Sequence, residues 1–399
     1  MPESPARALV ETLKRKGDLR DARVEAAFLE VPRHLFLPEL TLEQAYADEA
    51  VPTKRDSDGT PISSCSQPSM IAIMLEQLRL EPGHNVLEIG AGTGYNAALM
   101  QQIVGPAGHV TTIELDPQIA EQASDHLLRA GMSAVNVVPG DGAAGYPARA
   151  AYDRIMATAG IWDVPHTWVR QLRQRGILVA PLWLDAFQVS AAFHAQPDGS
   201  LFSAHNLPCG FIRLRGAAAG PTVQVRVGST PLFLTSSVAM QVDGTAIAML
   251  LAEDAADDHL GQALLSVEEW HGFLNYLSLH LAPEYILAGY VIAGDQKPYG
   301  LDGQGFAVLT RGSACFVPLR GQGALRYFGS GDALFTVREM LDQWGAVGRP
   351  GSNRLRLELT PRQRSLILEP ARVVDGVKIF PRFDHDLRVW VAMEGKDAP

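Results

Sequence analysis

The segment from Asn85 to Asn96 constrains this chain more than any other part of its sequence. It reads Asn-Val-Leu-Glu-Ile-Gly-Ala-Gly-Thr-Gly-Tyr-Asn, a short apolar run followed by glycines at positions 90, 92 and 94. The apolar run predicts a buried strand, and residues 96–104 behind it predict a helix. Glycines between the two remove side chains and permit positive φ angles, so the backbone can approach a bound molecule closely. The segment therefore predicts either a ligand-binding loop or a plain turn.

Strand and helix patterns alternate on both sides of this loop. Strands are predicted at 86–89, 109–114, 135–139, 152–158 and 177–182, and helices at 70–80, 96–104, 117–130 and 167–174. Repeated strand–helix–strand units predict an α/β fold, a mostly parallel sheet with helices on both faces. Ligands bind such sheets at the carboxyl ends of the strands. Ahead of the sheet, residues 5–30 predict two helices broken at Gly17-Asp18, and residues 48–69 predict a long loop.

The character of the chain changes at a run of small residues, Arg215-Gly-Ala-Ala-Ala-Gly-Pro221. We place the domain boundary there. An α/β domain is expected over residues 1–215 and a C-terminal α+β domain over residues 222–399. Helices are expected near 256–280 and 333–344, and Arg311-Gly-Ser313 between two apolar runs predicts a hairpin turn. Buried tryptophans of the second domain are expected at Trp270, Trp344 and Trp390.

Composition excludes several classes of protein. The formal net charge is −10, which argues against a nucleic-acid partner because phosphate binding needs a basic face. The three cysteines are far apart without CxxC spacing, so we expect a reducing cytoplasm and no structural zinc. The N-terminus lacks a signal-peptide pattern, and no apolar run reaches the ~20 residues of a membrane span. We therefore expect a cytoplasmic protein without a membrane partner or a metal ion.

Acidic residues fall near the carboxyl ends of three consecutive predicted strands. A carboxylate at Glu114 can accept both hydroxyls of a ribose, and Asp141 can accept from an adenine amino group. Glu88, just before the glycines, would repel a pyrophosphate but is acceptable beside a positive sulfonium. The form Glu-x-Gly-x-Gly-x-Gly resembles the S-adenosylmethionine loop of class I methyltransferases. The expected cofactor residues are Glu88, Gly90, Gly92, Gly94, Asn96, Glu114, Asp141 and Gly142.

Residues from about 20 to 215 resemble the protein-L-isoaspartate O-methyltransferase family. The matching motifs, in order, are Val31-Pro-Arg-His-Leu-Phe36, Ala45-Tyr-Ala-Asp48, Ser66-Gln-Pro68, Val86–Tyr95, Gly140-Asp-Gly142, Tyr152-Asp153 and Val164-Pro165. The resemblance implies a class I methyltransferase domain that transfers a methyl group from S-adenosylmethionine to an aspartyl or isoaspartyl carboxylate. A carboxylate is already ionised near pH 7, since its reference pKa is ~3.9. The reaction then needs alignment and exclusion of water rather than a general base.

The resemblance assigns the acceptor contact to the hydroxyl of Ser66. Ser64, Gln67 and Pro68 of the same loop, and Trp162 after the fourth strand, are expected to contact the substrate. Alternatives stay open: Ser66 as a turn residue, and Trp162 as a core residue. Cys65 is expected to be a small packing residue, because direct displacement needs no nucleophilic thiol. His34 is expected either to form a structural hydrogen bond or to contact the substrate.

Departures from the family pattern suggest a particular substrate. Ser69 stands where repair members commonly have histidine, the acceptor loop Ile62-Ser-Ser-Cys-Ser-Gln-Pro68 carries extra hydroxyls, and about 180 residues follow the minimal enzyme. These features resemble variants found with ribosomally made peptides, which esterify an aspartate of a lanthipeptide or graspetide precursor and so lead to an aspartimide. The partner would be an aspartate-containing, cyclised peptide, and the C-terminal domain would recognise it. The alternative is an isoaspartate repair enzyme with an extra domain. A nucleic-acid amino-methyltransferase is disfavoured because the Asn/Asp-Pro-Pro-aromatic segment is missing after the fourth strand.

Two C-terminal features complete the predictions. Asp384-His385-Asp386 is expected to be a solvated strand end rather than a metal site, because successive strand residues point to opposite faces. The alternation in Arg354-Leu-Arg-Leu-Glu-Leu359 predicts a half-exposed strand. Such a strand has an ordinary solvated face or, less readily, adds a peptide to its edge.

Overall fold

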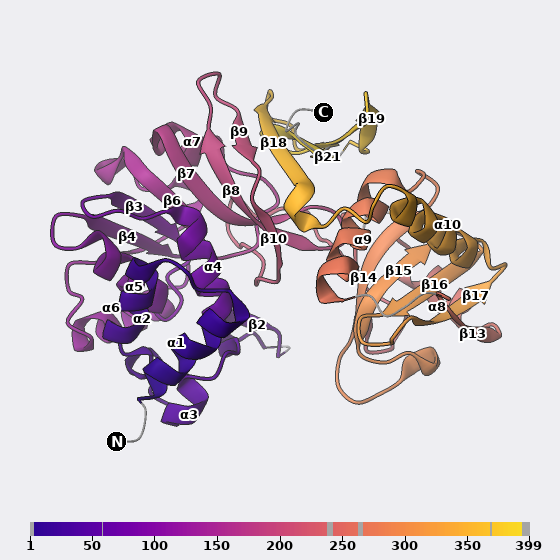
Figure 1. Cartoon of the computed structure of the whole chain (residues 1–399), viewed down its shortest axis with the longest axis horizontal. Helices are drawn as coiled ribbons and strands as arrows, with labels where there is room; N and C mark the ends of the chain where they lie inside the picture. Colours follow the sequence, from indigo (N-terminus) through magenta and orange to yellow (C-terminus); the bar gives the residue numbers. More distant parts are fainter. Residues whose placement is uncertain (1–3, 58, 238–241, 262–265, 368, 393–399) are drawn as a thin grey trace.

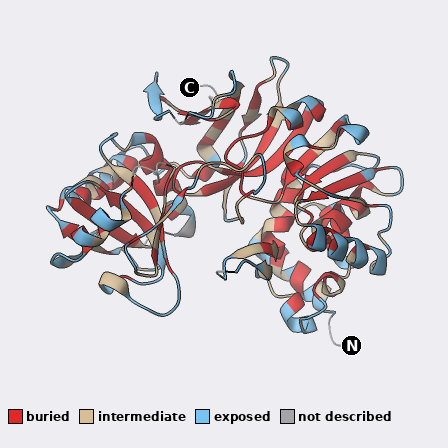
Figure 2. Ribbon diagram, turned by 180° about the vertical axis from the view of Figure 1, so that it is seen from behind, coloured by how far each residue is buried: buried red, intermediate tan, exposed pale blue. Residues whose placement is uncertain are grey.

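The computed structural model describes residues 4–57, 59–237, 242–261, 266–367 and 369–392. Besides a two-stranded hairpin, the described residues form two large β-sheets that lie side by side, each covered by helices (Figure 1). Figure 2 shows that buried residues concentrate in the sheets and on the helix faces turned toward them. The first half of the chain builds most of the larger sheet, and the orange segments of Figure 1 build the smaller one.

Two short helices begin the chain, as the sequence predicts. Helix α1 (Pro5–Lys16) ends at Gly17, whose φ of 81° suits glycine, and the Asp21 side chain caps α2 (Ala22–Glu30). Their apolar faces are buried with helix α5 (Tyr95–Val104) in one core cluster. The short helices η1 (Arg33–Phe36) and α3 (Leu42–Ala45) follow.

The predicted loop 48–69 contains a hairpin instead. Strand β1 (Val51–Arg55) pairs antiparallel with β2 (Pro61–Cys65), and helix α4 (Pro68–Leu78) begins directly afterwards. The serine-rich sequence of β2 lacks the apolar alternation that marks strands, which is why the sequence suggests a loop there. The hairpin brings β2 to the edge of the glycine loop.

The predicted parallel sheet is confirmed. Its parallel strands are β3 (Asn85–Ile89), β4 (His109–Glu114), β5 (Asn136–Pro139), β6 (Tyr152–Ala157) and β7 (Leu172–Trp183). Helices α5, α6 (Pro117–Arg129) and α7 (His166–Gln171) connect them, along with the short helices η2 (Gly142–Ala144) and η3 (Pro147–Arg149). The order β7-β6-β3-β4-β5 places β3 and its glycine loop in the middle, with neighbours on both sides.

The larger sheet continues with strands from both ends of the C-terminal half. Strand β7 pairs antiparallel with β8 (Gln188–Ala195), which also pairs with β9 (Leu201–Ser203) and β10 (Asn206–Cys209). Beyond β9 come β18 (Leu355–Pro361), β21 (His385–Val391), β20 (Val377–Pro381) and β19 (Arg372–Val374). The expected domain 222–399 is therefore divided, because residues 355–391 belong to the larger sheet. Strand β18 has partners on both edges, β9 and β21, which excludes peptide addition to it.

The smaller sheet is antiparallel, in the order β11-β12-β14-β15-β16-β17-β13. Its strands are β11 (Gln224–Arg226), β12 (Leu232–Thr235), β13 (Ala255–His259), β14 (Ile286–Ile292), β15 (Gln304–Leu309), β16 (Ser313–Pro318) and β17 (Ala324–Gly329). Helices α8 (Gly244–Leu251), α9 (Val267–His280) and α10 (Asp332–Ala346) accompany it, with the short helices η5 (Pro298–Gly300) and η6 (Ser352–Arg354). The hairpin turn at Arg311–Ser313 is confirmed, whereas the start of the predicted helix 256–280 is strand β13.

Tryptophan burial follows this division. Trp270 and Trp344 lie in the core of the smaller sheet, as expected. Trp390 is also buried, but it lies on β21 of the larger sheet and packs against Phe202, so its expected place in the second domain is wrong. A single sequence shows that a tryptophan is buried but not which sheet buries it.

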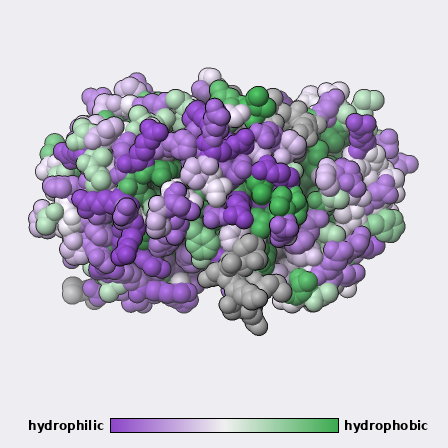
Figure 3. Space-filling view, turned by 90° about the horizontal axis from the view of Figure 1, so that it is seen from above, coloured by the Kyte–Doolittle hydropathy of each residue, from purple (hydrophilic) through white to green (hydrophobic). Residues whose placement is uncertain are grey.

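The face of the molecule drawn in Figure 3 is mostly polar. Seen from above, hydrophilic residues dominate the face in Figure 3, with separate hydrophobic patches between them. Within the described residues, every helix is too short or too polar to cross a membrane.

Candidate active site

A cavity that is partly open to solvent lies at the carboxyl ends of β3, β4 and β6. Its floor is the glycine loop, and one wall is the end of β2 with the residues that follow it. The lining also includes Glu114 at the end of β4 and the segment Phe211–Arg215. This is the position at which ligands of open α/β sheets bind.

The glycine loop has the conformation that its sequence predicts. Gly90, Gly92 and Gly94 have φ values of 100°, 52° and 86°, a region that other residues rarely adopt. A Cβ at Gly90 would lie 2.6 Å from Thr158 Oγ1, and one at Gly92 would lie 3.3 Å from the Ser64 carbonyl oxygen. A Cβ at Gly94 would meet Ala123 and Leu127 of α6 instead. Gly90 and Gly92 thus leave the cavity floor bare, while Gly94 lets α5 and α6 pack.

Glu114 stands at the cavity wall where β4 ends. Its side chain is 7% exposed, and its two oxygens accept from the backbone N–H groups of Gly92 (3.1 Å) and Asp116 (3.2 Å). Each carboxylate oxygen can accept more than one hydrogen bond, so both keep capacity for a ligand's hydroxyl groups. The glycine loop and Glu114 are therefore held in fixed relation to each other.

Glu88 lies deeper than the sequence suggests. It borders the cavity but has no exposed surface. The Asn96 amide donates to its Oε1 (2.7 Å), and the Thr112 hydroxyl donates to its Oε2 (2.6 Å). Burial, with a smaller contribution from the nearby Glu114 charge, raises the pKa of Glu88 to about 7 although the two hydrogen bonds act to lower it. Asn96 thus supports Glu88 at the base of the cavity.

Asp141 has a role that its sequence context does not reveal. It does not border the cavity; its carboxylate accepts from the backbone N–H groups of Ala143 (2.9 Å) and Ala217 (2.7 Å). The second bond fixes the small-residue run that the sequence suggests as a domain linker. Gly142 does border the cavity, and a Cβ there would lie 2.6 Å from Ile89.

The segment Phe211–Arg215 lines the cavity and carries no recognisable sequence motif. Backbone hydrogen bonds join Gly160 after β6 to Ile212 (2.8 Å) and Leu214 (2.9 Å). The side chain of Gln188 holds the backbone of Phe211 through both its amide atoms. Sequence reasoning missed this wall because it depends on pairing between segments that are far apart in the chain.

The acceptor loop brings Ser64 and Ser66 to the cavity. Ser66 is half-buried, and its carbonyl oxygen accepts from Arg33 Nη2 at 3.0 Å. The guanidinium of Arg33 is fully buried, donates also to the Ala45 carbonyl oxygen, and lies 4.9 Å from the centre of the Tyr95 ring. Arg33 therefore ties the acceptor loop to the first residue of α5.

The remaining predicted substrate residues lie outside the cavity. Gln67 donates to the Asp48 carbonyl oxygen, and Pro68 is buried at the start of α4. Trp162 is 6% exposed and lies beneath Arg382, whose guanidinium is 3.6 Å from the ring centre. The burial of Trp162 beneath Arg382 favours its interpretation as a core residue.

Other nearby predictions have clear outcomes. Cys65 is buried in the first core cluster, as expected, and His34 Nδ1 lies 3.1 Å from the Tyr46 hydroxyl in a structural contact. Ser69 does not border the cavity; its backbone N–H donates to Asp48 Oδ1. The absent histidine at this position therefore changes the support of the loop rather than the cavity wall.

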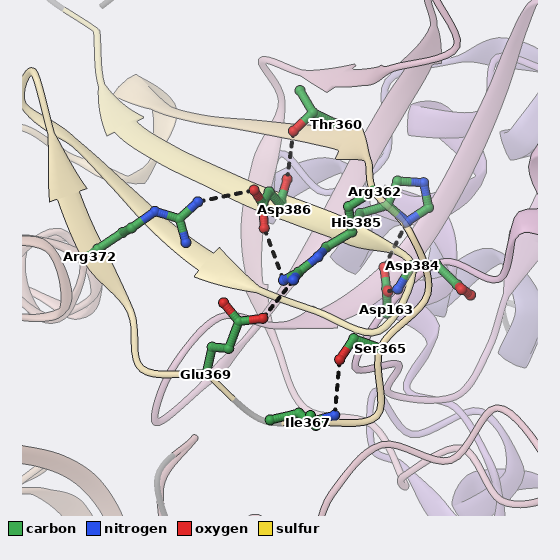
Figure 4. A network of polar contacts seen from close by, with 10 residues as sticks. All are labelled: Asp163, Thr360, Arg362, Ser365, Ile367, Glu369, Arg372, Asp384, His385 and Asp386. Carbon is green, nitrogen blue, oxygen red and sulfur yellow. Dashed lines mark hydrogen bonds and ion pairs between the residues drawn. The ribbon is translucent and has the colours of Figure 1, made fainter.

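Two residues of the triplet at 384–386, Asp384 and His385, are buried rather than solvated, whereas Asp386 is partly exposed. His385 has no exposed surface, and its Nδ1 lies 3.0 Å from Asp163 Oδ1. Figure 4 shows this pair beside Asp384, whose backbone N–H donates to Asp163 Oδ2. Asp386 points elsewhere and pairs with Arg362 (3.3 Å) and Arg372 (3.2 Å). The C-terminal strands thus hold the loop that follows β6.

The cavity fits the expected cofactor. Bare backbone at Gly90 and Gly92, together with a carboxylate at the end of the next strand, suits a nucleoside with two free hydroxyls. A partly ionised Glu88 below the loop suits a positively charged sulfonium and would repel a pyrophosphate. The residues present match S-adenosylmethionine.

Comparison with known proteins gives consistent matches. The model of the family "Protein-L-isoaspartate(D-aspartate) O-methyltransferase" matches residues 4–219. The chain is 42% identical over 209 residues to the protein-L-isoaspartate O-methyltransferase of Methanopyrus kandleri, covering 52% of this chain and 90% of that protein. It is 40% identical over 212 residues to that of Pyrococcus horikoshii, covering 52% and 91%. A solved protein-L-isoaspartate O-methyltransferase structure is 26% identical with a TM-score of 0.52, covering 88% of this chain and 96% of its own.

Proposed function

Because the chain belongs to the protein-L-isoaspartate O-methyltransferase family, and so is an S-adenosylmethionine-dependent carboxyl methyltransferase, we propose that it methylates isoaspartyl carboxylates in proteins or peptides. The observation that carries this proposal is the shared cavity. One wall offers the glycine loop and Glu114 to the cofactor, and the other offers Ser64 and Ser66 to an acceptor.

When bound, S-adenosylmethionine supplies an electrophilic methyl carbon on a sulfonium sulfur, which keeps the electron pair of the broken bond. The chain's own residues bind and align the reactants. Glu114 and the bare backbone at Gly90 and Gly92 would hold the cofactor, while the Ser66 hydroxyl donates to an acceptor carboxylate and orients it. The segment Phe211–Arg215 lines the cavity and would limit the access of water to the bound reactants. No side chain has to remove a proton, because the acceptor is already ionised.

The similarity to isoaspartate methyltransferases supports the isoaspartyl substrate. It extends over 90% of the Methanopyrus kandleri protein. The solved structure that covers 88% of this chain also bears that name. The long C-terminal part of this chain is therefore not evidence in itself for a different substrate.

A second candidate is the esterification of an aspartate in a cyclised ribosomal peptide, which leads to an aspartimide. The observation that favours it is the hydroxyl-rich acceptor loop, since Ser63, Ser64 and Ser66 all border the cavity. Extra hydroxyl donors beside the acceptor change which carboxylates fit. The C-terminal half, expected from the sequence to recognise such a peptide, would then select the cyclised form.

A comparison of three peptides tests both candidates. The purified full chain is incubated with S-adenosylmethionine and a linear isoaspartyl peptide, its aspartyl isomer, or a cyclised aspartyl peptide, and the products are weighed by mass spectrometry. The proposal expects one added methyl group on the isoaspartyl peptide and none on its linear isomer. Methylation of the cyclised peptide alone, followed by loss of methanol, would replace the first candidate with the second. A Glu114→Gln variant serves as the cofactor-binding control.

A further inference from the structure

We propose that Arg215 binds the acceptor carboxylate and so gives the site its preference for an anionic acceptor. This inference rests on the proposed carboxyl methylation and names a residue that no motif of the sequence indicates. It starts from the wall of the cavity that the segment Phe211–Arg215 forms.

The backbone of Arg215 is held on both sides. On one side the N–H group of Leu214 donates to the Gly160 carbonyl oxygen at 2.9 Å. On the other, the N–H group of Ala217 donates to Asp141 Oδ2 at 2.7 Å. A Cβ at the neighbouring Gly216 would lie 2.5 Å from that same carboxylate, so the chain runs closely against Asp141. These bonds fix where Arg215 enters the cavity wall.

The two arginines of this wall differ in their partners. The guanidinium of Arg213 donates to the carbonyl oxygens of Gly220 and Pro221 and so folds the following loop. Burial lowers the pKa of Arg213. Arg215 also borders the cavity but is exposed, and among the described residues its guanidinium has no hydrogen bond or ion pair. Arg215 is therefore the basic side chain of this wall that is free to meet a ligand.

The acidic side chains of the cavity make a positively charged group necessary for binding a carboxylate. Glu88 and Glu114 both border it, and each repels an approaching carboxylate when ionised. Ser66, which borders the same cavity, contributes only a neutral hydroxyl. A guanidinium can bind the non-reacting oxygen of a carboxylate through a charge-assisted hydrogen bond and leave the other oxygen free to react.

This arrangement has a kinetic consequence. The acceptor carboxylate loses its charge as the ester forms, so the contact with Arg215 is no stronger in the transition state than in the bound substrate. An interaction of that kind lowers KM without raising kcat. Loss of Arg215 should therefore appear in KM for the peptide, whereas loss of an alignment residue should appear in kcat.

The test compares Arg215→Gln and Arg215→Lys with the unmodified chain. Calorimetry, with S-adenosylhomocysteine bound, measures the affinity for a peptide with the acceptor carboxylate and for the same peptide with a carboxamide. Arg215→Gln should weaken carboxylate binding, and raise KM, about tenfold or more, since hydrogen bonds between charged groups are the stronger kind. Carboxamide binding and kcat should stay within about twofold, and Arg215→Lys should recover part of the loss.

Two results would overturn the inference. One is equal carboxylate affinity in Arg215→Gln and the unmodified chain. The other is weakened binding of S-adenosylhomocysteine itself, which would assign Arg215 to the cofactor's own carboxylate. Because affinity is measured without turnover, the test stands even if no peptide is methylated, and only that failure would count against the proposed function. The matched control is Arg320→Gln, at an exposed arginine that follows β16 of the smaller sheet, and it should leave carboxylate binding unchanged.

Discussion

Replacing Glu88 with glutamine should change how the stability of the protein depends on pH. Glutamine keeps the shape of the side chain, its oxygen can accept from Asn96, and its amide can donate to Thr112. The substitution therefore removes a titrating group while the two buried hydrogen bonds are kept. Glu88 has no exposed surface, so solvent screening does little to reduce the effect.

The magnitude follows from the pKa of Glu88, which burial raises from 4.5 to about 7. One pKa unit corresponds to 1.36 kcal/mol, so ionising Glu88 in the folded protein costs about 3 kcal/mol. Below pH 4.5 the group is protonated in both states and adds no penalty. Between pH 4.5 and 7 only the unfolded chain releases the proton, so the folded state loses stability as pH rises. Above that range the penalty is constant.

Urea unfolding of both proteins at about pH 5.5 and about pH 8 measures the effect. The free energy of unfolding of Glu88→Gln relative to the unmodified chain should increase by about 2 kcal/mol between the two pH values. Glu121→Gln, at an exposed position of α6, should show little change and serves as the control. Parallel pH profiles for Glu88→Gln and the unmodified chain would refute the reasoning.

Three further substitutions separate the parts of the site. Glu114→Gln should weaken S-adenosylhomocysteine binding about tenfold in calorimetry, because an acceptor facing the cavity becomes partly a donor; an unchanged Kd would contradict its role. Ser66→Ala should leave that Kd unchanged and lower kcat about tenfold, and an unchanged rate would remove the serine from the acceptor site. Gly90→Ala should destabilise the protein by about 2 kcal/mol or more, since its φ is 100° and the new Cβ meets Thr158 Oγ1. Gly345→Ala, in α10 with open space around it, should not destabilise the protein, and equal losses in both variants would show that the contact at Gly90 is unimportant.

The parallel sheet and the cofactor side of the cavity could be predicted because their signals are local. The apolar run before Gly90 marks β3, and the end of the next strand places Glu114 beside the glycine loop. The short motif after β2 likewise places Ser66 at the cavity. In each case a few adjacent residues determine both the element and its position in the sheet.

The remaining features depend on contacts between distant segments, which local patterns do not contain. The run after Arg215 resembles a linker in composition, yet Asp141 holds it against the cavity. Glu88 has the expected position along the chain, but only the three-dimensional packing shows that it is buried with Asn96. The polar sequence around His385 suggests solvent exposure, whereas its partner Asp163 lies far away in the chain.

The pairing of β9 with β18 has a consequence for biosynthesis. Roughly 150 residues separate the two strands, so the larger sheet stays open at β9 until nearly the whole chain has left the ribosome. The entropy of closing such a loop grows only with the logarithm of its length, and a smaller sheet that folds first would bring the two ends together. The order of synthesis thus favours early folding of the smaller sheet, whose strands lie between β9 and β18 in the chain. Until β18 pairs with it, β9 is an exposed edge of the larger sheet, and such an edge is prone to aggregation.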